Sequence, residues 1–539
     1  MDQSFVSERA GITSTHSSVS HWPADTSHPL ADEPVGAMLR RLAGSVGERP
    51  AIVDRTPNGA TVSTAYAELY AAADAMAHGL LSIATPGERI GIWAPNSTEW
   101  VIVEYAAALA GLVLVPLNPA LTDPEVADLL DRSACVVLFT VRDFRGEPLL
   151  ERAASVISPR VRAVCDLATC QASLQSSPTA AMPVVSPDQP LLVQYTSGTT
   201  GTPKAAVLTH RAALNIGVLT GPLLGLCDGP VWCNPMPMHH VGGSVCVLLT
   251  VLANAGTMVL MPSFEAGEFL EMLEQTRANV IGAVPTMLLG MLDHPSFADR
   301  DLSALKLLQT GGSTVAPALI RRVEEAFGAQ IVNAYGQSEA PSAVQTRLTD
   351  SDETKALTIG RPGLHREARI VRPGADGTDE TVPFGESGEL LIRSSLTMTE
   401  YLDDPGQTAT ALDASGWLHT GDLCSMAPDG VLTIRGRIRD VIIRGGENVY
   451  PPEVENVLLA HPAISDVAVL GVPDTRWGEQ IGAAVRFRAG ASPTWDELET
   501  FARGSLAGFK VPRIWRAVEE FPTTASGKVQ KYRLREAFK

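Results

Sequence analysis

Short apolar runs that alternate with helix-length amphipathic segments from about Pro34 onward constrain the fold more than any other feature of this sequence. Such alternation is typical of parallel β-sheets whose strands are joined by crossover helices. One clear unit is a strand at 89–93 (RIGIW), a helix after the capping pair Asn96-Ser97, and a strand at 112–116 (LVLVP). The sequence therefore predicts βαβ units in a large α/β domain.

A second unit of this kind combines a strand at 305–309, a helix that begins near Pro317, and a strand at 330–334. Ligands of parallel sheets collect at the carboxyl ends of the strands. We therefore expect Gly311-Gly312-Ser313 and the stretch from Asn333 to Glu339 to lie in one crevice.

The length of 539 residues exceeds what one hydrophobic core usually holds, so the chain is expected to form at least two domains. We expect a loose arm at 1–33, which is rich in Ser, Thr, His and Pro, and a large domain at 34–438. A small α+β domain is predicted at 439–539, with the boundary near Asp440. Its predicted elements are a helix at 452–460, strands at 465–470 and 481–488, a helix at 495–505 and a strand at 514–518.

The formal net charge of -18 argues against non-specific binding of nucleic acid, because there is no global excess of cations to contact phosphates. The seven cysteines are scattered without a CxxC pair, which favours reduced thiols and a cytoplasmic protein. The start of the chain lacks the pattern of a signal peptide. The longest apolar stretch, 245–261, is interrupted by Asn254 and Gly256, so it predicts a buried helix and strand without integral membrane contact.

A loop rich in Thr, Ser and Gly lies between two short apolar runs in the segment from Leu191 to His210. Glycines let successive backbone N–H groups face one anion, hydroxyls add donors, and Lys204 adds charge. Composition alone leaves a phosphate nest and a flexible hairpin equally open. The spacing is not that of a Walker loop, and the chain has no GxGxxG dinucleotide turn.

The loop sequence YTSGTTGTPK resembles the phosphate loop of the adenylate-forming superfamily, which includes acyl-CoA synthetases, adenylation domains of peptide synthetases and firefly luciferase. Further matches follow in the family's order and span about residues 190 to 531: PMPMHHVGG at 235–243, NAYGQSE at 333–339, GWLHTGDL at 416–423, GRIRDVIIRGGENVYPPEVE at 436–455, and PTTASGKVQK at 522–531. The resemblance implies an α/β fold in which a large N-terminal domain of mixed and parallel sheets, flanked by helices, carries a small barrel-like subdomain. A small mobile α+β C-terminal domain would follow.

The resemblance also implies an activity. A monocarboxylic acid, fatty or aryl, would be activated by ATP to an acyl adenylate with release of pyrophosphate, and coenzyme A would then form a thioester. ATP, Mg²⁺ and coenzyme A are the implied cofactors and substrates. Transfer to a carrier-protein thiol, an amine or another small nucleophile stays open, as does a homodimer. A regulator that binds nucleotide without catalysis is the alternative from a different class.

In the family, residues that match Tyr335 and Asn333 contact adenine, and those that match Asp422 and Arg437 hold the ribose hydroxyls. Glu339 resembles the carboxylate that holds magnesium against the phosphates, where a hard oxygen ligand suits a hard cation. Taken singly, each of these residues would pass as an ordinary core, turn or surface residue. The implied nucleotide-binding set is Thr196, Ser197, Gly198, Thr199, Thr200, Gly201, Lys204, Gly312, Ser313, Asn333, Ala334, Tyr335, Gly336, Ser338, Asp422, Arg437 and Lys528. Ser338 replaces the usual threonine and keeps the hydroxyl.

Lys528 matches the lysine that stabilises the charge built up during adenylation. Arg439 matches the hinge of the small domain, a position that is commonly Asp or Lys. Gly445, Gly446 and Glu447 would line the path of the pantetheine arm; alternatively this segment is a turn before a helix that Asn448 caps.

His240 matches the residue at the mouth of the acyl pocket, and Gly242 and Gly243 follow where some relatives carry bulky side chains. With Gly311 and Gly336 they predict an open pocket for a fatty or aryl acid. The predicted catalytic residues are thus Lys528, His240, Thr196 and Glu339, and Glu339 is the predicted metal ligand.

Overall fold

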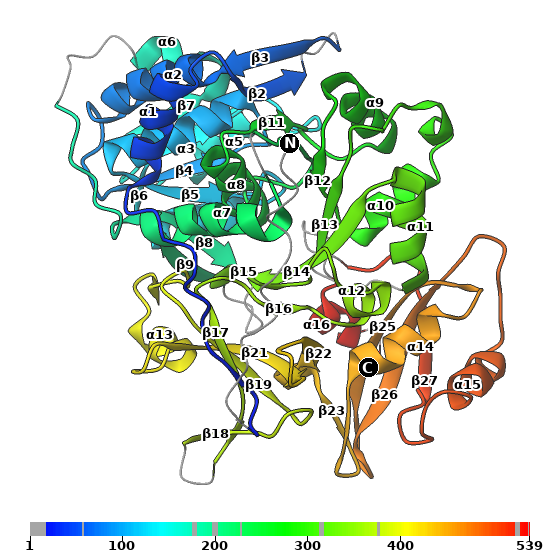
Figure 1. Ribbon diagram of the computed structural model, residues 1–539. Coiled ribbons are helices and arrows are strands. Elements are labelled where there is room, and N and C mark those ends of the chain that lie inside the picture. The colour runs from blue at the N-terminus through cyan, green and yellow to red at the C-terminus, as the bar shows by residue number, and fades with distance from the viewer. Residues whose placement is uncertain are drawn as a thin grey trace.

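The computed structural model of the chain describes residues 18–55, 59–174, 181–196, 203–226, 229–311, 317–374, 378–522, 529–536 and 538 (Figure 1). Four sheets organise these residues, two of them built mainly from parallel strands. Within this described part, no helix has the length and apolar character needed to cross a membrane.

A seven-stranded sheet has the order β20-β9-β8-β5-β4-β6-β7. Its strands β4 to β8 pair in parallel, whereas β9 and β20 pair antiparallel at one edge. The strands are β4 (Arg89–Trp93), β5 (Val113–Leu117), β6 (Cys135–Thr140), β7 (Ala163–Asp166), β8 (Pro190–Thr196), β9 (Lys204–Thr209) and β20 (Glu400–Tyr401).

A nine-stranded sheet has the order β16-β15-β14-β13-β12-β10-β11-β2-β3, with a parallel centre and antiparallel edges. Its strands are β2 (Pro50–Arg55), β3 (Thr61–Ala65), β10 (Val231–Asn234), β11 (Thr257–Leu260), β12 (Val280–Gly282), β13 (Leu307–Gly311), β14 (Gln330–Gln337), β15 (Ala340–Gln345) and β16 (Arg361–Pro362).

Helices fill the space between these two sheets and cover their outer faces. The central core joins strands of both sheets to α1 (Val35–Ser45), α2 (Tyr66–Leu80), α3 (Thr98–Ala110), α7 (His210–Leu224) and α8 (Leu248–Ala253). The outer face of the seven-stranded sheet packs on α4 (Asp123–Arg132) and α5 (Leu149–Val156), and that of the nine-stranded sheet packs on α9 (Ala266–Thr276), α10 (Pro285–Leu292) and α11 (Pro317–Phe327). The remaining helical elements here are α6 (Leu167–Leu174), the π-helix η1 (Gly242–Val247), the 3-10 helix η2 (Phe297–Asp299) and α12 (Asp352–Leu357).

A third, antiparallel sheet follows, with the path β1-β17-β19-β21-β22 and β18 paired to β17. Its elements are β1 (His21–Trp22), β17 (Glu367–Pro373), β18 (Asp379–Thr381), β19 (Ser387–Arg393), α13 (Pro405–Ala411), β21 (Trp417–Met426) and β22 (Leu432–Arg437). In Figure 1 these strands, yellow-green to yellow apart from the blue β1, lie below the two large sheets.

The C-terminal part has its own sheet and its own buried core, which α14 and α15 share with β25 and β26. Figure 1 shows it in orange and red beside β22. Its elements are η3 (Ile438–Asp440), β23 (Ile442–Arg444), β24 (Glu447–Val449), α14 (Pro451–Leu459), β25 (Ile464–Asp474), β26 (Gly478–Phe487), α15 (Trp495–Arg503), β27 (Ile514–Ala517) and α16 (Lys531–Glu536).

The structure confirms both predicted βαβ units, since β4 pairs in parallel with β5 and β13 pairs in parallel with β14. The helix between β4 and β5 begins because the Ser97 side chain accepts a hydrogen bond from the backbone N–H of Trp100. The apolar stretch 245–261 forms a buried helical segment and β11, as predicted.

Two expectations are wrong in detail. Part of the arm expected to be loose is held in place, because β1 pairs antiparallel with β17 and the Ser20 hydroxyl donates to the carbonyl of Pro383. Asn448 does not cap a helix, because it lies in β24 and Tyr450 occupies the N-cap position of α14 without a side-chain cap.

Candidate functional site

The segment from Asn333 to Glu339 lies where three sheets meet. It runs from β14 into the turn before β15, and a register shift between Tyr335 and Gln337 bends this edge. Gly311, the last residue of β13, pairs with Ala334, as the predicted crevice requires. The side-chain amide of Gln337 lies 3.5 Å from the carbonyl oxygen of Thr420 in β21, which links this edge to the third sheet.

Asp422 forms the centre of a buried polar cluster. The Tyr335 hydroxyl donates to its Oδ2 at 2.5 Å, and Nε of Arg437 lies 2.9 Å from its Oδ1. Asp422 is only 2% exposed, so these two partners stabilise its carboxylate in place of water. Burial, followed by the charge of Asp422, raises the pKa of Tyr335 well above its usual value, so the phenol stays a hydrogen-bond donor.

Antiparallel pairing sets this arrangement, because Asp422 and Arg437 are directly opposite each other in β21 and β22. Asn333 lies two residues before Tyr335 in β14 and is 5% exposed. Its side-chain N–H donates to the carbonyl of Thr358 at 3.1 Å. Tyr335, Asp422 and Arg437 thus meet from two sheets.

A second cluster surrounds Glu339, which is 8% exposed. The Tyr401 hydroxyl donates to Oε1 of Glu339 at 2.7 Å, and burial, followed by the charge of Glu339, raises the pKa of Tyr401. The Lys204 ammonium lies 4.8 Å from the centroid of the Tyr401 ring. Pairing of β20 with β9 brings Tyr401 to Lys204, so one phenol contacts a cation through its ring and a carboxylate through its hydroxyl.

The predicted phosphate loop begins and ends in this region. Thr196 and Lys204 are paired residues at the ends of β8 and β9, and Lys204 lies over the ring of Tyr401, which bonds Glu339. The residues Ser197, Gly198, Thr199, Thr200, Gly201, Gly312, Ser313 and Lys528 lie outside the described residues. Ser338, in the turn before β15, is 7% exposed.

Two buried amides hold the segment that carries His240. Asn96 donates to the carbonyls of Met236 and Met261 and accepts from the backbone N–H of Met238 at 2.8 Å. Gln194, in β8, donates to the carbonyl of His239 at 3.0 Å. The His240 Nδ1 accepts from the backbone N–H of Gly242, which fixes the ring at the start of η1.

The glycines predicted to open the acyl pocket have different surroundings. A Cβ on Gly242 would lie 3.3 Å from His240 Nδ1 and 3.7 Å from Met236 Cε, so a side chain there would project beside His240. A Cβ on Gly243, Gly311 or Gly336 would lie within 2.6 Å of a backbone atom. These three glycines permit close packing of the backbone, and Gly242 is the position at which a larger side chain would change the space near His240.

The predicted path of the pantetheine arm is a hairpin turn. Gly445 and Gly446 join β23 to β24 with φ of +61° and +89°, a conformation that favours glycine. The turn and Glu447 are exposed, and within the described residues no atom beyond the chain neighbours lies within 4 Å of a Cβ placed on Gly446. Arg439, the predicted hinge, is exposed in η3 between β22 and β23.

Sequence reasoning missed two residues of this site. Tyr401 lies in a two-residue strand outside every recognised motif, and only the pairing of β20 with β9 places it at Glu339. Asn96 was read as part of a helix cap, although its side chain contacts residues about 140 positions further along the chain. A second capping-type residue before a helix that Ser97 already caps was the one signal that the sequence offered.

Comparison with known proteins adds independent findings. The sequence profile of the AMP-binding enzymes matches residues 39–402, and that of the AMP-binding enzyme C-terminal domain matches residues 453–528. The putative acyl-CoA synthetase YngI of Bacillus subtilis (strain 168) is 34% identical over 94% of this chain and 97% of its own length. The mitochondrial medium-chain acyl-CoA ligase ACSF2 of Macaca fascicularis is 34% identical over 95% of this chain and 88% of its own. The crystal structure of ATP-bound MatB from Rhodopseudomonas palustris superposes with a TM-score of 0.84 at 25% identity, covering 93% of this chain and 99% of that one.

Proposed function

Because the chain belongs to the family of AMP-binding enzymes, we propose that it is an AMP-forming acid–thiol ligase of the acyl-CoA synthetase type. It activates a monocarboxylic acid with ATP to an acyl adenylate and pyrophosphate. The acyl group then passes to the thiol of coenzyme A, and AMP leaves. Acyl-CoA synthetases and ligases are the named relatives that match almost the whole chain.

The buried cluster of Tyr335, Asp422 and Arg437 is the observation that carries this proposal. A carboxylate held in place by a phenol and a guanidinium is a ready acceptor for the two hydroxyls of a ribose. The Tyr335 ring, which lies beside it, offers a flat face for adenine. Asn333 and the backbone around Gly312 then read the polar edge of the base.

Glu339 suits the Mg²⁺ ion that accompanies ATP. Its carboxylate is buried, and Tyr401 takes one of its oxygens, which leaves a hard oxygen ligand of the kind that Mg²⁺ prefers. When bound there, the ion neutralises phosphate charge. Thr196, Lys204 and the loop between them supply hydroxyl, backbone and ammonium donors to the same phosphates.

Two groups of the C-terminal part serve the two half-reactions. Lys528 stabilises charge during attack of the carboxylate on the α-phosphate, and the turn at Gly445-Gly446 lets the pantetheine arm pass close to the backbone. The domain boundary near 439 and a hinge at Arg439 belong to this proposal, because a rotation there exchanges the two groups. The separate sheet and core after Ile442 support it.

The acid enters beside His240. Because Gly242 has no side chain, it leaves room there for a fatty or aryl group. The proposed location is the cytoplasm, in keeping with the free cysteines of the described residues. A carrier-protein thiol or an amine is the alternative acceptor of the same acyl adenylate.

Exchange of labelled pyrophosphate into ATP tests the proposal directly. A panel of fatty acids of increasing length and of aryl acids is assayed with the full chain and Mg²⁺, and thioester formation is then followed with and without coenzyme A. Exchange that depends on the acid, together with a thioester that depends on coenzyme A, is expected. Exchange without a thioester points to another acceptor, and nucleotide binding without exchange for any acid would identify a non-catalytic regulator.

A further inference from the structure

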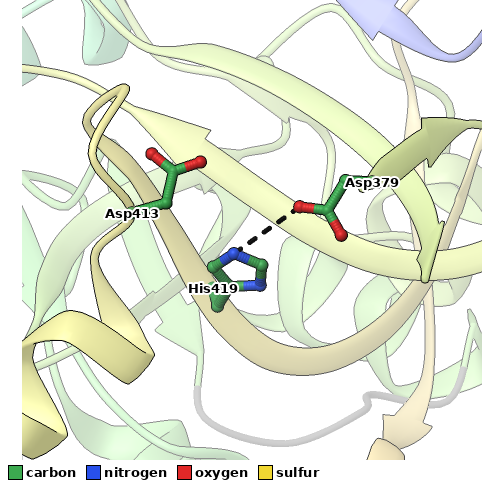
Figure 2. A group of neighbouring side chains, drawn as sticks. All are labelled: Asp379, Asp413 and His419. Atoms are coloured by element: carbon green, nitrogen blue, oxygen red, sulfur yellow. Dashed lines mark ion pairs between the residues drawn. The ribbon is translucent and has the colours of Figure 1, made fainter. Parts of the chain in front are cut away.

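A group of metal-ligating side chains lies in the third sheet, away from Glu339. His419 comes from β21, Asp379 from β18, and Asp413 from the turn that precedes β21 (Figure 2). One ligand atom from each lies within 4.8 Å of the other two. The side chains of His419 and Asp379 are 25% and 21% exposed, so a small ion has access while the groups stay partly shielded.

A carboxylate outside this trio fixes the imidazole ring. Glu389 Oε2 lies 3.0 Å from His419 Nδ1, and Glu389 Oε1 accepts the backbone N–H of Gly421. A ring whose Nδ1–H is held by a carboxylate presents Nε2 as its free ligand atom. This is the usual support of a metal-bound histidine.

The distance from Nε2 of His419 to Oδ2 of Asp379 is 3.6 Å, which is too long for a hydrogen bond. The same sheet holds a contrasting pair, since Nε2 of His21 lies 2.7 Å from Oε1 of Glu367, a direct hydrogen bond. Two ligand atoms that are each about 2.1 Å from a tetrahedral ion are about 3.4 Å apart. The spacing at His419 therefore matches two atoms that share an ion.

Hydrogen bonds to the backbone hold the Asp413 carboxylate, the third of the three candidate ligands, in place. Its Oδ1 accepts the backbone N–H groups of Ser415 and Trp417, so the carboxylate is oriented by the turn. Figure 2 shows its carboxylate and that of Asp379 to the upper left and upper right of the His419 ring, on the side of the nitrogen that faces Asp379. Asp379, Asp413 and Glu389 bring three negative charges together, and Arg369, 4.0 Å from Asp379, offsets one of them. A divalent cation would balance the rest.

We propose that His419, Asp379 and Asp413 form a binding site for a divalent transition metal ion, with Zn²⁺ as the best match and water completing the coordination. An imidazole ligand favours Zn²⁺ over Mg²⁺, which prefers oxygen alone. The ion would join β18 and the turn at Asp413 to β21. Its contact in β21 is His419, three residues before Asp422. None of its three ligands belongs to the proposed nucleotide or acyl sites.

Metal binding to the untagged full chain, freed of metal by a chelator and kept free of nucleotide, tests this site. Zn²⁺ is titrated by equilibrium dialysis at micromolar concentrations, and Co²⁺ is added separately because tetrahedral coordination gives it strong visible absorption. We expect one Zn²⁺ per chain at this site and a Co²⁺ spectrum that Zn²⁺ abolishes. Asp379→Asn and His419→Gln should each weaken binding about tenfold or more.

The matched control is His21→Gln, which removes the other histidine–carboxylate pair of the same sheet and should leave metal binding unchanged. Zn²⁺ should also raise the melting temperature of the wild type and of this control more than that of Asp379→Asn. If His419→Gln does not fold, Asp379→Asn decides the question, because Asp379 lies in a short strand outside the main path of the sheet. Equal Zn²⁺ affinity in wild type and Asp379→Asn, or no binding by the wild type, would overturn the proposal.

Discussion

The hydroxyl of Tyr335 donates a hydrogen bond of 2.5 Å to Oδ2 of Asp422, and this contact joins β14 of one sheet to β21 of another. Arg437 engages the other oxygen of the same carboxylate at 2.9 Å. Both oxygens of the Asp422 carboxylate therefore have a partner within the chain. Each carboxylate oxygen can accept a further hydrogen bond, so a ribose that binds Asp422 shares these oxygens with Tyr335 and Arg437 or displaces them.

Loss of the Asp422 carboxylate should weaken nucleotide binding. We expect Asp422→Ala to bind ATP more weakly by about 2 kcal/mol, roughly thirtyfold, because the ribose hydroxyls lose a charged acceptor. Tyr335→Phe is the matched control, since it keeps the ring and frees Oδ2, and its ATP affinity should stay within about threefold of wild type. Calorimetric titration measures both, and unchanged affinity in folded Asp422→Ala would contradict the ribose assignment.

A bulky side chain at position 242 should change the choice of acid. In Gly242→Phe the Cβ would lie 3.3 Å from His240 Nδ1 and the ring would extend from there, so larger acids should lose pyrophosphate exchange while ATP binding persists. Gly242→Ala should give a smaller shift in the same direction. Profiles over the same panel of acids measure the effect, and a profile identical to wild type would exclude Gly242 from the pocket.

The two half-reactions should separate by mutation of the C-terminal part. Lys528→Ala should slow adenylation about a hundred- to a thousandfold, because a donor to the developing charge is lost, yet it should still convert supplied acyl adenylate to thioester. Gly446→Trp should do the reverse, since its indole would fill space that the pantetheine arm needs.

Gly446→Ala is the control for the second variant, because it carries the same backbone strain at φ of +89° without the bulk. Both half-reactions are measured on all three variants. A parallel loss of both halves in Lys528→Ala and Gly446→Trp would rule out the exchange of groups by rotation at Arg439.

His210 should make the stability of the large domain depend on pH. Burial lowers the pKa of its imidazole to about 4, and the side chain is 0% exposed at the start of α7. The folded-state pKa lies below the unfolded value of about 6.5, so His210 is protonated at a lower pH in the native state than in the unfolded state. Stability is therefore complete above about pH 6.5 and falls as the pH drops toward 4, by roughly 3 kcal/mol in total.

His210→Asn retains an acceptor for the backbone N–H of Val35, which His210 Nδ1 now accepts at 3.4 Å, and it does not titrate. Urea unfolding at pH 7 and pH 5 should show a smaller difference for this variant than for wild type. An equal pH dependence in both proteins would show that His210 does not account for it.

Local pattern determined much of this protein. The strand at 89–93, the Ser97 cap and the strand at 113–117 follow from apolar periodicity and capping, which act between residues a few positions apart. The sequence motifs also identified Tyr335, Asp422, Arg437 and Glu339, because each site residue lies in a recognisable stretch. The structure brings Tyr335, Asp422 and Arg437 into contact, and the roles of all four residues stay predictions.

Tertiary structure alone decided which distant residues complete the sites. Tyr401 reaches Glu339 because β20 pairs with β9, whose residues lie nearly two hundred positions earlier, and Asn96 holds Met236 and Met238 across a similar gap. His419 meets Asp379 only because β18 and β21 belong to one sheet. Such contacts depend on strand order and register, which are fixed when many apolar faces pack at once, and no local run of residues encodes them.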